Sequence, residues 1–415
     1  MRVLHVISTP GPGGAGHQLR LLVRRLPHDN EVVMLAPAAS RVPGKLEDRP
    51  GTEPAADGIA DALRAEGARV HRLTATCDRD PGAIARLRRL MLDGRYDVVH
   101  THLYRASVQG RIAARLAGVP HVVTTEHHLG AEVLEGRRVS PGVRALYLAG
   151  ERLGQVTIAA SPAIAGRLRD WGVPDERIAM IPKAIDPTEF RFDRRTRAIT
   201  RARLGVEPGV PLVGGVGRLE PDKRFDLLIR AIAEVPDACL LLVGDGPARA
   251  SLERLAVIEG VADRVLFAGA VVHTREMLCA MDVFASPDSR TFGLAILEAI
   301  ASGLPAVYAA CPPLEERITA RAAVHGTHRL SPRDRESLPR ALRAELLCLD
   351  ERGGARLPGR SVSSRYDADH LAAAVGRLYE RIADRPRRRQ VIAPLLAYRG
   401  RARRFPLPGG KVRNA

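Results

Sequence analysis

Short apolar runs rich in β-branched residues recur along this chain with helix-like segments between them, and this alternation limits the possible folds more than any other feature. Six such runs lie in the first half, at residues 2–8, 31–37, 68–73, 97–102, 121–127 and 155–160. Five more follow, at residues 211–217, 238–244, 264–269, 282–287 and 305–310. Strands that alternate with helices are typical of a parallel sheet with helices on both faces. The sequence therefore predicts two doubly wound α/β units in series.

The break between the two sets of runs predicts where the first domain ends. Residues 185–192, IDPTEFRF, are charged and carry a proline, and no strand-like run crosses them. A chain of 415 residues is also too long for one compact core. We therefore expect an α/β protein with two Rossmann-like, doubly wound parallel-sheet domains that face a cleft, at residues 1–187 and 188–365. An amphipathic helix is expected at residues 366–383 and a basic, disordered tail at residues 384–415.

Composition and the opening residues limit where the protein works. Hydrophobic residues make up 45% and charged residues 27% of the chain, as in ordinary water-soluble proteins. No apolar run approaches the roughly 18 residues that a membrane-spanning helix needs. The opening MRVLHVIST is short, lacks a cleavage site and leads into glycines as a first strand would. Five cysteines without C-x-x-C spacing indicate neither a zinc cluster nor a disulfide framework, so the sequence predicts a cytoplasmic protein.

The net charge of +17 indicates anionic partners. A strongly basic protein favours nucleic acid, anionic lipid or phosphorylated ligands. Aromatic residues are only 4% of the chain, and no RNP-like, helix-turn-helix or zinc-finger pattern occurs, which argues against specific binding of nucleic acid. The basic residues of 384–415 form either a solvated end or a peripheral contact with the anionic inner face of a membrane.

A glycine-rich segment, GPGGAG at residues 11–16, follows the first predicted strand and precedes a predicted helix. Glycine lets backbone amides approach a ligand closely, and the amino end of a helix favours anions. A tight strand-to-helix connection with no ligand is the alternative interpretation. The segment is therefore a candidate anion site only if other motifs support it.

Three segments of the second half carry the most specific motifs. Residues 216–232 read VGRLEPDKRFDLLIRAI, residues 241–256 read LLVGDGPARASLERLA, and residues 286–305 read SPDSRTFGLAILEAIASGLP. Together they resemble the nucleotide-sugar signature of retaining glycosyltransferases of family 4, which have the two-domain GT-B fold. The resemblance extends over nearly all of residues 2–382. It implies an acceptor-side first domain, a nucleotide-sugar second domain, and a last helix at 366–383 that returns to the first domain.

The resemblance also assigns roles at the donor site. Arg218 and Lys223 would stabilise the leaving diphosphate, because fixed cations favour a negative charge that develops during reaction. Glu298 would bind the ribose hydroxyls. The other positions expected to bind the donor are Gly13, Gly14, Gly244, Gly246, Arg290, Phe292, Gly293 and Leu294, with Gly13 and Gly14 near either the phosphates or the acceptor. Two exposed cations at an ordinary helix start are the alternative for Arg218 and Lys223.

The chain departs from the family pattern in two places. Arg290 stands where the family keeps the first glutamate of E-x-F-G-x-x-x-x-E, and a guanidinium cannot act as an acidic group. Asp288, in the same turn, is a candidate replacement carboxylate. Lys183 and Ala184 replace the Asn and Gly of the hinge motif I-P-N-G-I-D, which predicts a hinge less free in its backbone angles.

Four histidines lie where two predicted strands end: His100, His102, His127 and His128. Open α/β sheets bind ligands at this edge. The TTEHH stretch resembles the T-x-H of the family, whose histidine contacts the donor sugar, and the spacing favours His127 over His128. A zinc site is an alternative, because the H-x-H of a strand points both rings to one side. A histidine satisfied by backbone groups beside the cleft is a further alternative.

The activity that the resemblance implies is transfer of a sugar from a nucleoside-diphosphate sugar to an acceptor with retention of anomeric configuration. No metal or cofactor is required in this mode, and the acceptor is a sugar, a lipid-linked precursor or a small molecule. Arg290 motivates an alternative, a catalytically impaired GT-B protein that binds nucleotide sugar or partners an active transferase. An epimerase or phosphorylase of the same fold ranks last, because neither catalytic pattern is recognisable in the sequence.

Overall fold

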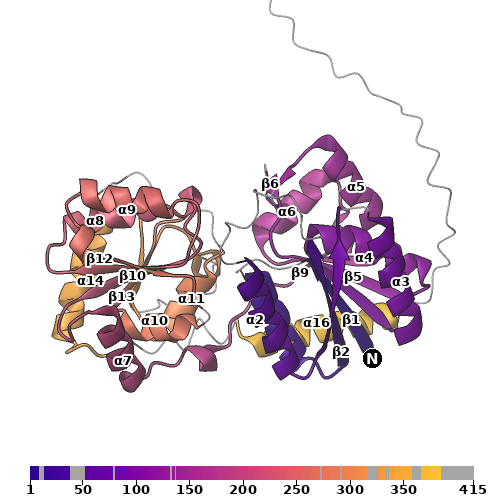
Figure 1. Ribbon diagram of the computed structural model, residues 1–415, viewed down its shortest axis with the longest axis horizontal. Helices are drawn as coiled ribbons and strands as arrows, with labels where there is room; N and C mark the ends of the chain where they lie inside the picture. Colours follow the sequence, from indigo (N-terminus) through magenta and orange to yellow (C-terminus); the bar gives the residue numbers. More distant parts are fainter. Residues whose placement is uncertain are drawn as a thin grey trace, which may run out of the picture.

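Two all-parallel sheets, one in each half of the chain, form two lobes in the computed structural model (Figure 1). The structure describes residues 1–8, 14–37, 52–77, 80–130, 133–135, 137–271, 273–289, 292–315, 326–331, 334, 336–357 and 366–384. The prediction of an α/β fold with two doubly wound parallel sheets is confirmed. Residues 385–415, which hold all but the first residue of the basic tail, lie outside the described part.

The first sheet has seven strands in the order β3-β2-β1-β4-β5-β8-β9. Its strands are β1 (Arg2–Ser8), β2 (Asp29–Pro37), β3 (Arg69–Ala75), β4 (Val98–His102), β5 (His121–Glu126), β8 (Val156–Ala159) and β9 (Ile178–Met180). Six of them match the apolar runs of the sequence. β9 was not predicted, and its place in the sheet depends on its pairing with β8. A separate small hairpin joins β6 (Val133–Leu134) to β7 (Arg137–Arg138).

The second sheet has six strands in the order β12-β11-β10-β13-β14-β15. Its strands are β10 (Leu212–Val216), β11 (Cys239–Val243), β12 (Val265–Gly269), β13 (Val283–Ser286), β14 (Ala306–Tyr308) and β15 (Thr327–Arg329). The strand order reverses between β1 and β4 in the first sheet and between β10 and β13 in the second. Ligands of open α/β sheets bind outside the carboxyl ends of the strands at such a reversal. The topology therefore directs attention to the segments after these four strands.

Helices cover both faces of each sheet, which explains why a central strand such as β11 is apolar throughout rather than alternating. The first lobe contains α1 (Gly14–Arg25), α2 (Thr52–Ala65), α3 (Pro81–Gly94), α4 (Tyr104–Leu116), α5 (Pro141–Glu151), α6 (Pro162–Trp171) and η1 (Asp175–Arg177). The second contains α7 (Arg194–Leu204), η3 (Pro221–Lys223), α8 (Phe225–Ala233), α9 (Arg249–Ile258), η4 (Ala262–Arg264), α10 (Thr274–Ala280), α11 (Leu294–Ala301), α12 (Pro312–Glu315) and α14 (Ser337–Glu351). On β1, Leu4 and Val6 pack towards α3 and α4, whereas Ile7 packs towards α1.

Local sequence explains several helix starts. Asp80, Ser140 and Ser161 each accept a hydrogen bond from the backbone amide three residues on, and each is followed by a proline at the first helical position. Residues 38–51 lie outside the described part, and α2 begins at Thr52.

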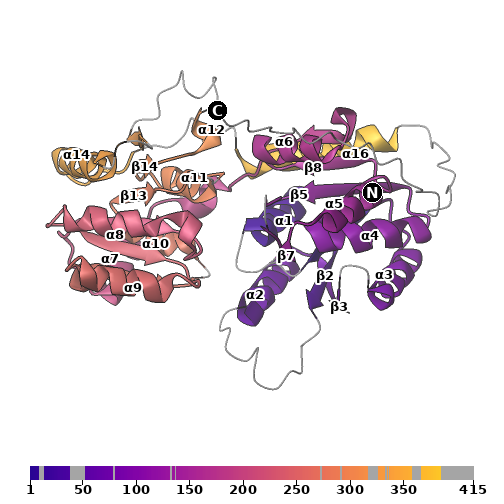
Figure 2. The ribbon, with the colours of Figure 1, turned by 90° about the horizontal axis from the view of Figure 1, so that it is seen from above.

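The chain crosses between the lobes twice, and the two crossings lie side by side. The first contains η2 (Pro187–Phe190), and the second leads into α16 (Ala368–Ala383), which packs on α1 in the first lobe (Figure 1 and Figure 2). The amide of Ile185 donates to the carbonyl of Tyr366 at 2.8 Å, and the amide of Ala368 donates to the carbonyl of Ile185 at 2.9 Å. None of the described helices combines the length and hydropathy needed to cross a membrane.

The hinge at Ala184 is held by a side chain as well as by its own backbone. The Nε2 of Gln18, on α1, donates to the carbonyl of Ala184 at 2.6 Å, and the amide of Ala184 donates to the Oε1 of Gln18 at 2.8 Å. Gln18 is buried. This paired contact fixes the backbone of the hinge to the first lobe, in the same place where the sequence lacks the glycine of the family motif.

Candidate active site

The amino-terminal ends of two helices from different lobes lie together. Gly14 begins α1 and Leu294 begins α11, and a Cβ built on Gly14 would lie 3.3 Å from the Cδ1 of Leu294. Helix starts carry unpaired backbone amides and a partial positive charge, so they favour anions. Gly13, also predicted at this site, lies outside the described residues. The amino ends of α1 and α11 are therefore adjacent, and each favours an anion.

Gly293 sets the start of α11 and has to be glycine. Its φ of 91° is in the left-handed region, and a Cβ there would lie 2.5 Å from the Sγ of Cys311. The preceding Phe292 faces the first lobe, with the Nζ of Lys183 5.8 Å from the centre of its ring. The predicted segment from Phe292 to Leu294 therefore reaches the hinge as well as α1.

Lys183 is a residue that the sequence singled out only as a change in the hinge. The structure places its half-buried ammonium among residues of both lobes. Burial, followed by the positive charge of the nearby Lys223, lowers the pKa of Lys183 to about 8. On the first lobe, the same ammonium lies close enough to His127 to contribute to lowering the pKa of that ring.

These contacts define one place, which we call the interdomain junction. From the first half of the chain it contains Gly14, His127, His128 and Lys183, and from the second half Arg218, Lys223, Phe292, Gly293, Leu294 and Glu298. Most of the predicted site residues are therefore brought together by the fold. Arg290 lies outside the described residues. Gly244 and Gly246 do not belong to the junction itself but support the loop that carries Arg218.

The two predicted phosphate-binding cations have acidic partners in this structure. Arg218 bonds to Glu220 two residues on, and its side chain is exposed. The Nζ of Lys223 donates to the Oδ2 of Asp288 at 2.6 Å, and the Asp288 side chain is only 3% exposed. Lys223 is therefore not the exposed cation of the alternative interpretation. Lys223 is instead oriented by a buried carboxylate from the turn after β13.

Glu298 occupies the first turns of α11 and is half-buried. Burial, followed by the negative charge of Glu189, raises the pKa of its carboxyl to about 7. No described residue donates a hydrogen bond to this carboxylate. A desolvated carboxylate without a partner is costly unless a ligand compensates it. Two vicinal hydroxyls, such as those of a ribose, would supply the missing donors.

Gly244 and Gly246 support the loop that carries Arg218. Gly244 has a φ of 137°, and a Cβ there would lie 1.8 Å from the carbonyl oxygen of Gly217. A Cβ on Gly246 would lie 2.5 Å from the carbonyl oxygen of Leu219, whose amide donates to Asp245 at 2.9 Å. The two loops interlock too closely for any side chain. The G-x-G-P motif therefore shapes the site by positioning the neighbouring loop.

Gly244→Ala is expected to lower the free energy of unfolding by about 3 kcal/mol and to weaken nucleotide binding, because the added methyl displaces the loop that carries Arg218. Thermal unfolding and calorimetry on the purified variant measure both quantities. Gly209→Ala is the matched control, since nothing lies within 4 Å of a Cβ at that position. Unchanged stability and binding in Gly244→Ala would show that the two loops are not interlocked.

The predicted histidines separate into a buried group and an exposed residue. His100, His102 and His127 are buried, whereas His128 is exposed. His5 joins the buried group and was missed, although it lies opposite His100 in the register of β1 with β4. The apolar first strand hid this signal, because a single histidine in a buried strand is usually structural. Partial burial and the positive charges of Lys183 and Arg218 lower the pKa of His128, which places that ring at the junction.

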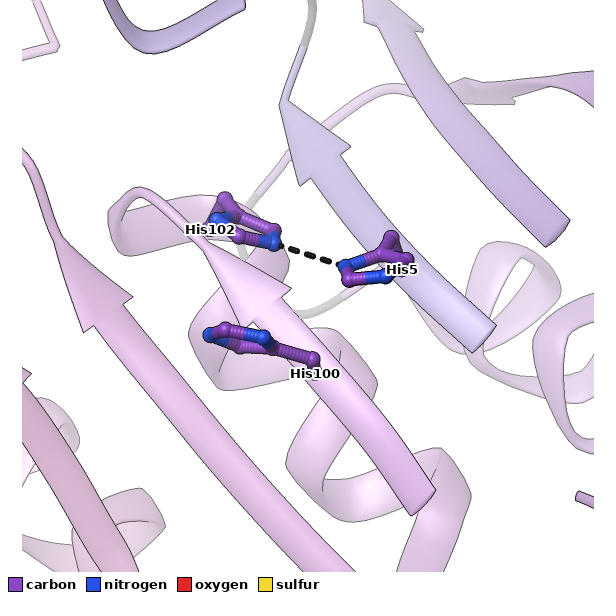
Figure 3. Close-up of side chains that lie close together, drawn as sticks. All are labelled: His5, His100 and His102. Atoms are coloured by element: carbon purple, nitrogen blue, oxygen red, sulfur yellow. Dashed lines mark hydrogen bonds between the residues drawn. The ribbon is translucent and has the colours of Figure 1, made fainter. Parts of the chain in front are cut away.

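The buried histidines have the residue types and spacing of a metal site, but hydrogen bonds explain their positions. The ligand atoms of His5, His100 and His102 lie within 4.8 Å of one another (Figure 3). A His5 nitrogen lies 3.1 Å from one of His102, and His100 contacts Tyr379 at 2.6 Å and Thr125 at 2.7 Å. A zinc ion would have to displace some of these partners. We therefore favour a hydrogen-bonded cluster.

Comparisons with known proteins place the chain in a family. Residues 12–189 match the sequence profile of Glycosyltransferase Family 4, and residues 210–346 match that of Glycosyl transferases group 1. D-inositol 3-phosphate glycosyltransferase of Nocardia farcinica is 31% identical over 333 residues, which cover 73% of this chain and 71% of that protein. A GDP-mannose-dependent alpha-(1-6)-phosphatidylinositol monomannoside mannosyltransferase of Mycobacterium tuberculosis is 34% identical over 273 residues, covering 61% and 68%.

Solved structures agree on the fold. Anabaena HepE in complex with UDP has a TM-score of 0.71 at 20% identity, over 92% of this chain and 100% of that one. WaaG, a glycosyltransferase involved in lipopolysaccharide biosynthesis, has a TM-score of 0.58 at 20% identity, over 92% and 98%. The chain belongs to glycosyltransferase family 4 and has the GT-B fold. It is a glycosyltransferase.

Proposed function

We propose that this glycosyltransferase takes its sugar from a nucleoside-diphosphate sugar and retains the anomeric configuration in the product. The observation that carries the proposal is the meeting of the α1 and α11 amino ends beside Lys223 and Glu298. A diphosphate suits the helix ends and the cation, and a ribose suits the unpartnered carboxylate. HepE was solved with UDP and with UDP-glucose, and the mycobacterial relative is named for GDP-mannose, which supports a nucleotide-sugar donor.

The junction stabilises departure of the nucleoside diphosphate through charges that are fixed before the reaction. As the bond between the sugar and the phosphate breaks, negative charge accumulates on the phosphate oxygens. Arg218, Lys223 and the two helix starts would lower the energy of that charge. Glu298 would hold the ribose, and His127 would position the sugar. In this mechanism the acceptor attacks from the face that the diphosphate leaves, so neither a protein nucleophile nor a metal is required.

The acceptor is proposed only as a class. The names of the relatives include an inositol phosphate, a phosphatidylinositol mannoside and a lipopolysaccharide core, which are all hydroxyl-bearing and anionic molecules. A net charge of +17 is consistent with such acceptors and with peripheral contact between the basic tail and an anionic membrane surface. We propose a hydroxyl-bearing acceptor with a sugar, lipid-linked or small-molecule body.

A thermal-shift panel with UDP, GDP and ADP, followed by an assay of nucleotide release from matching sugars, tests the proposal. A ligand that binds only the folded state raises the melting temperature by mass action. We expect one nucleoside diphosphate to stabilise the protein more than the others, and its sugar to be transferred or slowly hydrolysed. The anomeric configuration of the product, determined by NMR, tests retention. No stabilisation by any nucleotide would contradict the proposal.

A protein that binds nucleotide sugar without transferring it is the second candidate, and Arg290 is the residue that favours it. We expect Arg290→Glu to increase transfer from neutral donors, because a carboxylate supports the positive charge that develops on the sugar. Transfer and hydrolysis are measured against neutral and uronic-acid nucleotide sugars. A loss of activity confined to an acidic donor would instead assign Arg290 to binding that acid. If neither activity nor donor preference changes, Arg290 does not act on the sugar.

A further inference from the structure

A row of hydrogen-bonded imidazoles leads from the interior of the first lobe to the interdomain junction. The Nε2 of His127 lies 3.1 Å from the Nδ1 of His102. The Nε2 of His102 lies 3.1 Å from the Nδ1 of His5, and these two rings are joined by the dashed line in Figure 3. The Nε2 of His5 lies 3.3 Å from the Oδ1 of Asn30. All four side chains are buried.

Asn30 gives this row a direction. Its Nδ2 donates to the carbonyls of Leu26 at 3.3 Å and His28 at 2.9 Å, which turns its Oδ1 towards His5. An amide oxygen only accepts, so His5 must carry its hydrogen on Nε2 and leave Nδ1 as an acceptor.

The tautomers of His102 and His127 follow from that of His5. His102 donates from Nε2 to the acceptor on His5 and therefore accepts at its own Nδ1. His127 must in turn donate from Nε2. The row consequently leaves the Nδ1 of His127 without a hydrogen and with an unused lone pair of electrons.

The rings have to be neutral for this logic to hold, and their surroundings keep them so. Burial lowers the pKa of His5 to about 4, and burial together with the charge of Lys183 lowers the pKa of His127 to about 3. Burial and the neighbouring histidines hold the pKa of His102 well below its usual value. At neutral pH each ring therefore has one hydrogen and one lone pair.

The open end of the row lies beside a donor. Within the described part of the chain the Nδ1 of His127 is buried and has no hydrogen-bond partner. His127 and Lys183 both line a cavity of about 20 Å³, which is large enough for one water-sized group. Lys183 offers N–H donors and His127 offers a lone pair. A hydroxyl satisfies both at once, whereas a carboxylate can only accept from Lys183 and gives nothing to the lone pair.

We propose that Asn30, His5 and His102 are positioning residues that hold His127, which the proposed function places at the sugar, in its Nε2–H tautomer, and that Lys183 adds a hydrogen-bond donor to the sugar-hydroxyl subsite at the free Nδ1 of His127. The ligand rests on the proposed transfer function, whereas the tautomer does not. The row ends at an amide that cannot take up a proton. It therefore fixes the direction of the hydrogen bonds and does not conduct protons.

The tautomer is measured directly by long-range NMR on the full-length protein labelled with ¹⁵N-histidine. Signals of His127 are assigned from their loss in His127→Asn. We expect a protonated Nε2 and an unprotonated Nδ1 from about pH 6 to about pH 8 in the free protein. A protonated Nδ1 overturns the proposal, as does a stoichiometric zinc ion that is retained by the parent and lost in His5→Gln, because a metal would occupy the bonding nitrogens.

Three substitutions distinguish the effect of the hydrogen-bonded row from the effect of side-chain packing. His102→Leu removes the acceptor for His127 and is expected to give a mixture of tautomers, whereas His102→Asn keeps an acceptor oxygen and is expected to preserve the Nε2–H form. His100→Asn is the matched control, since His100 packs against His102 with 4.2 Å between ring centres but forms its hydrogen bonds outside the row. An altered His127 tautomer in His100→Asn alone would overturn the proposed order. The NMR measurement on the parent protein tests the His127 tautomer even if His102→Leu does not fold.

The subsite is tested with UDP-glucose and GDP-mannose, each beside its uronic-acid counterpart and its nucleoside diphosphate. We expect the neutral sugar of the preferred nucleotide to move the His127 Nδ1 signal and to bind roughly tenfold more tightly than the uronic acid. A signal that moves only when an acceptor sugar is added assigns the hydroxyl to the acceptor. Tighter binding of the uronic acid overturns the subsite. If the tautomer holds and no nucleotide sugar binds, the proposed function fails and the row stands.

Discussion

Lys223→Ala is expected to reduce sugar transfer by roughly 10²- to 10³-fold, the loss usually seen when one charge-stabilising group is removed from an active site. It is also expected to lower the free energy of unfolding by about 2 kcal/mol, because the buried carboxylate of Asp288 loses its 2.6 Å partner. Steady-state kinetics and thermal unfolding measure the two effects on the same preparation.

The double variant Lys223→Ala/Asp288→Asn separates the two roles. Neutralising Asp288 removes the buried negative charge that Lys223 compensated, so stability is expected to recover while transfer stays low. Arg230→Ala is the matched control, since Arg230 pairs with Glu259 on the surface of the same lobe. Transfer at the parent rate in Lys223→Ala would remove this lysine from the reaction and leave it as a structural partner of Asp288.

Glu298→Gln is expected to weaken binding of the preferred nucleoside diphosphate by roughly 10- to 100-fold at pH 8, where the parent carboxylate is ionised and can accept from both ribose hydroxyls. In the parent, affinity should rise with pH through about 7, since binding favours the ionised form of a group whose pKa is about 7. In the variant this dependence should be absent. Calorimetry from pH 6 to pH 8 measures both curves.

The same residue gives a prediction for stability of the free protein. The folded pKa of Glu298 lies above the unfolded value of 4.5, so the folded state holds the extra proton between these values. The free energy of unfolding of the parent therefore falls as pH rises from 4.5 towards 7. Glu298→Gln should be more stable than the parent at pH 8 and should lose that advantage near pH 4. Glu253→Gln, at an exposed position, is the control. Equal pH profiles for all three proteins would contradict an unpartnered Glu298.

The sequence was sufficient for the fold because the relevant signal is local and repeated. Runs such as residues 239–243 are apolar throughout, as expected for a strand covered on both faces, and similar runs recur along the chain. Two strands gave no such signal. β9 and β15 have three residues each, and their place in the sheets depends on pairing with β8 and β14 rather than on their own pattern.

The site was only partly predictable, because its remaining properties depend on contacts between distant segments. Arg218 and Glu298 were identified by their positions in motifs that resemble those of the family. The partner of Lys223 did not, since Asp288 lies 65 residues away and meets it only through the neighbouring strands β10 and β13. No motif indicated the roles of His5 and Lys183. These roles appear only when β1 is paired with β4 and the hinge is folded against Phe292.

Hydrogen–deuterium exchange with and without the preferred nucleoside diphosphate tests the central claim, that the ligand is bound between the α1 and α11 amino ends. We predict slower exchange in two segments that are distant in sequence, residues 14–18 and 292–298, and in the loop that carries Arg218 and Lys223, with little change elsewhere. Protection of neither segment would contradict the account. Protection confined to the pocket of about 430 Å³ beside Arg2, Glu31 and Tyr96, at the amino ends of the strands of the first sheet, would also contradict the account.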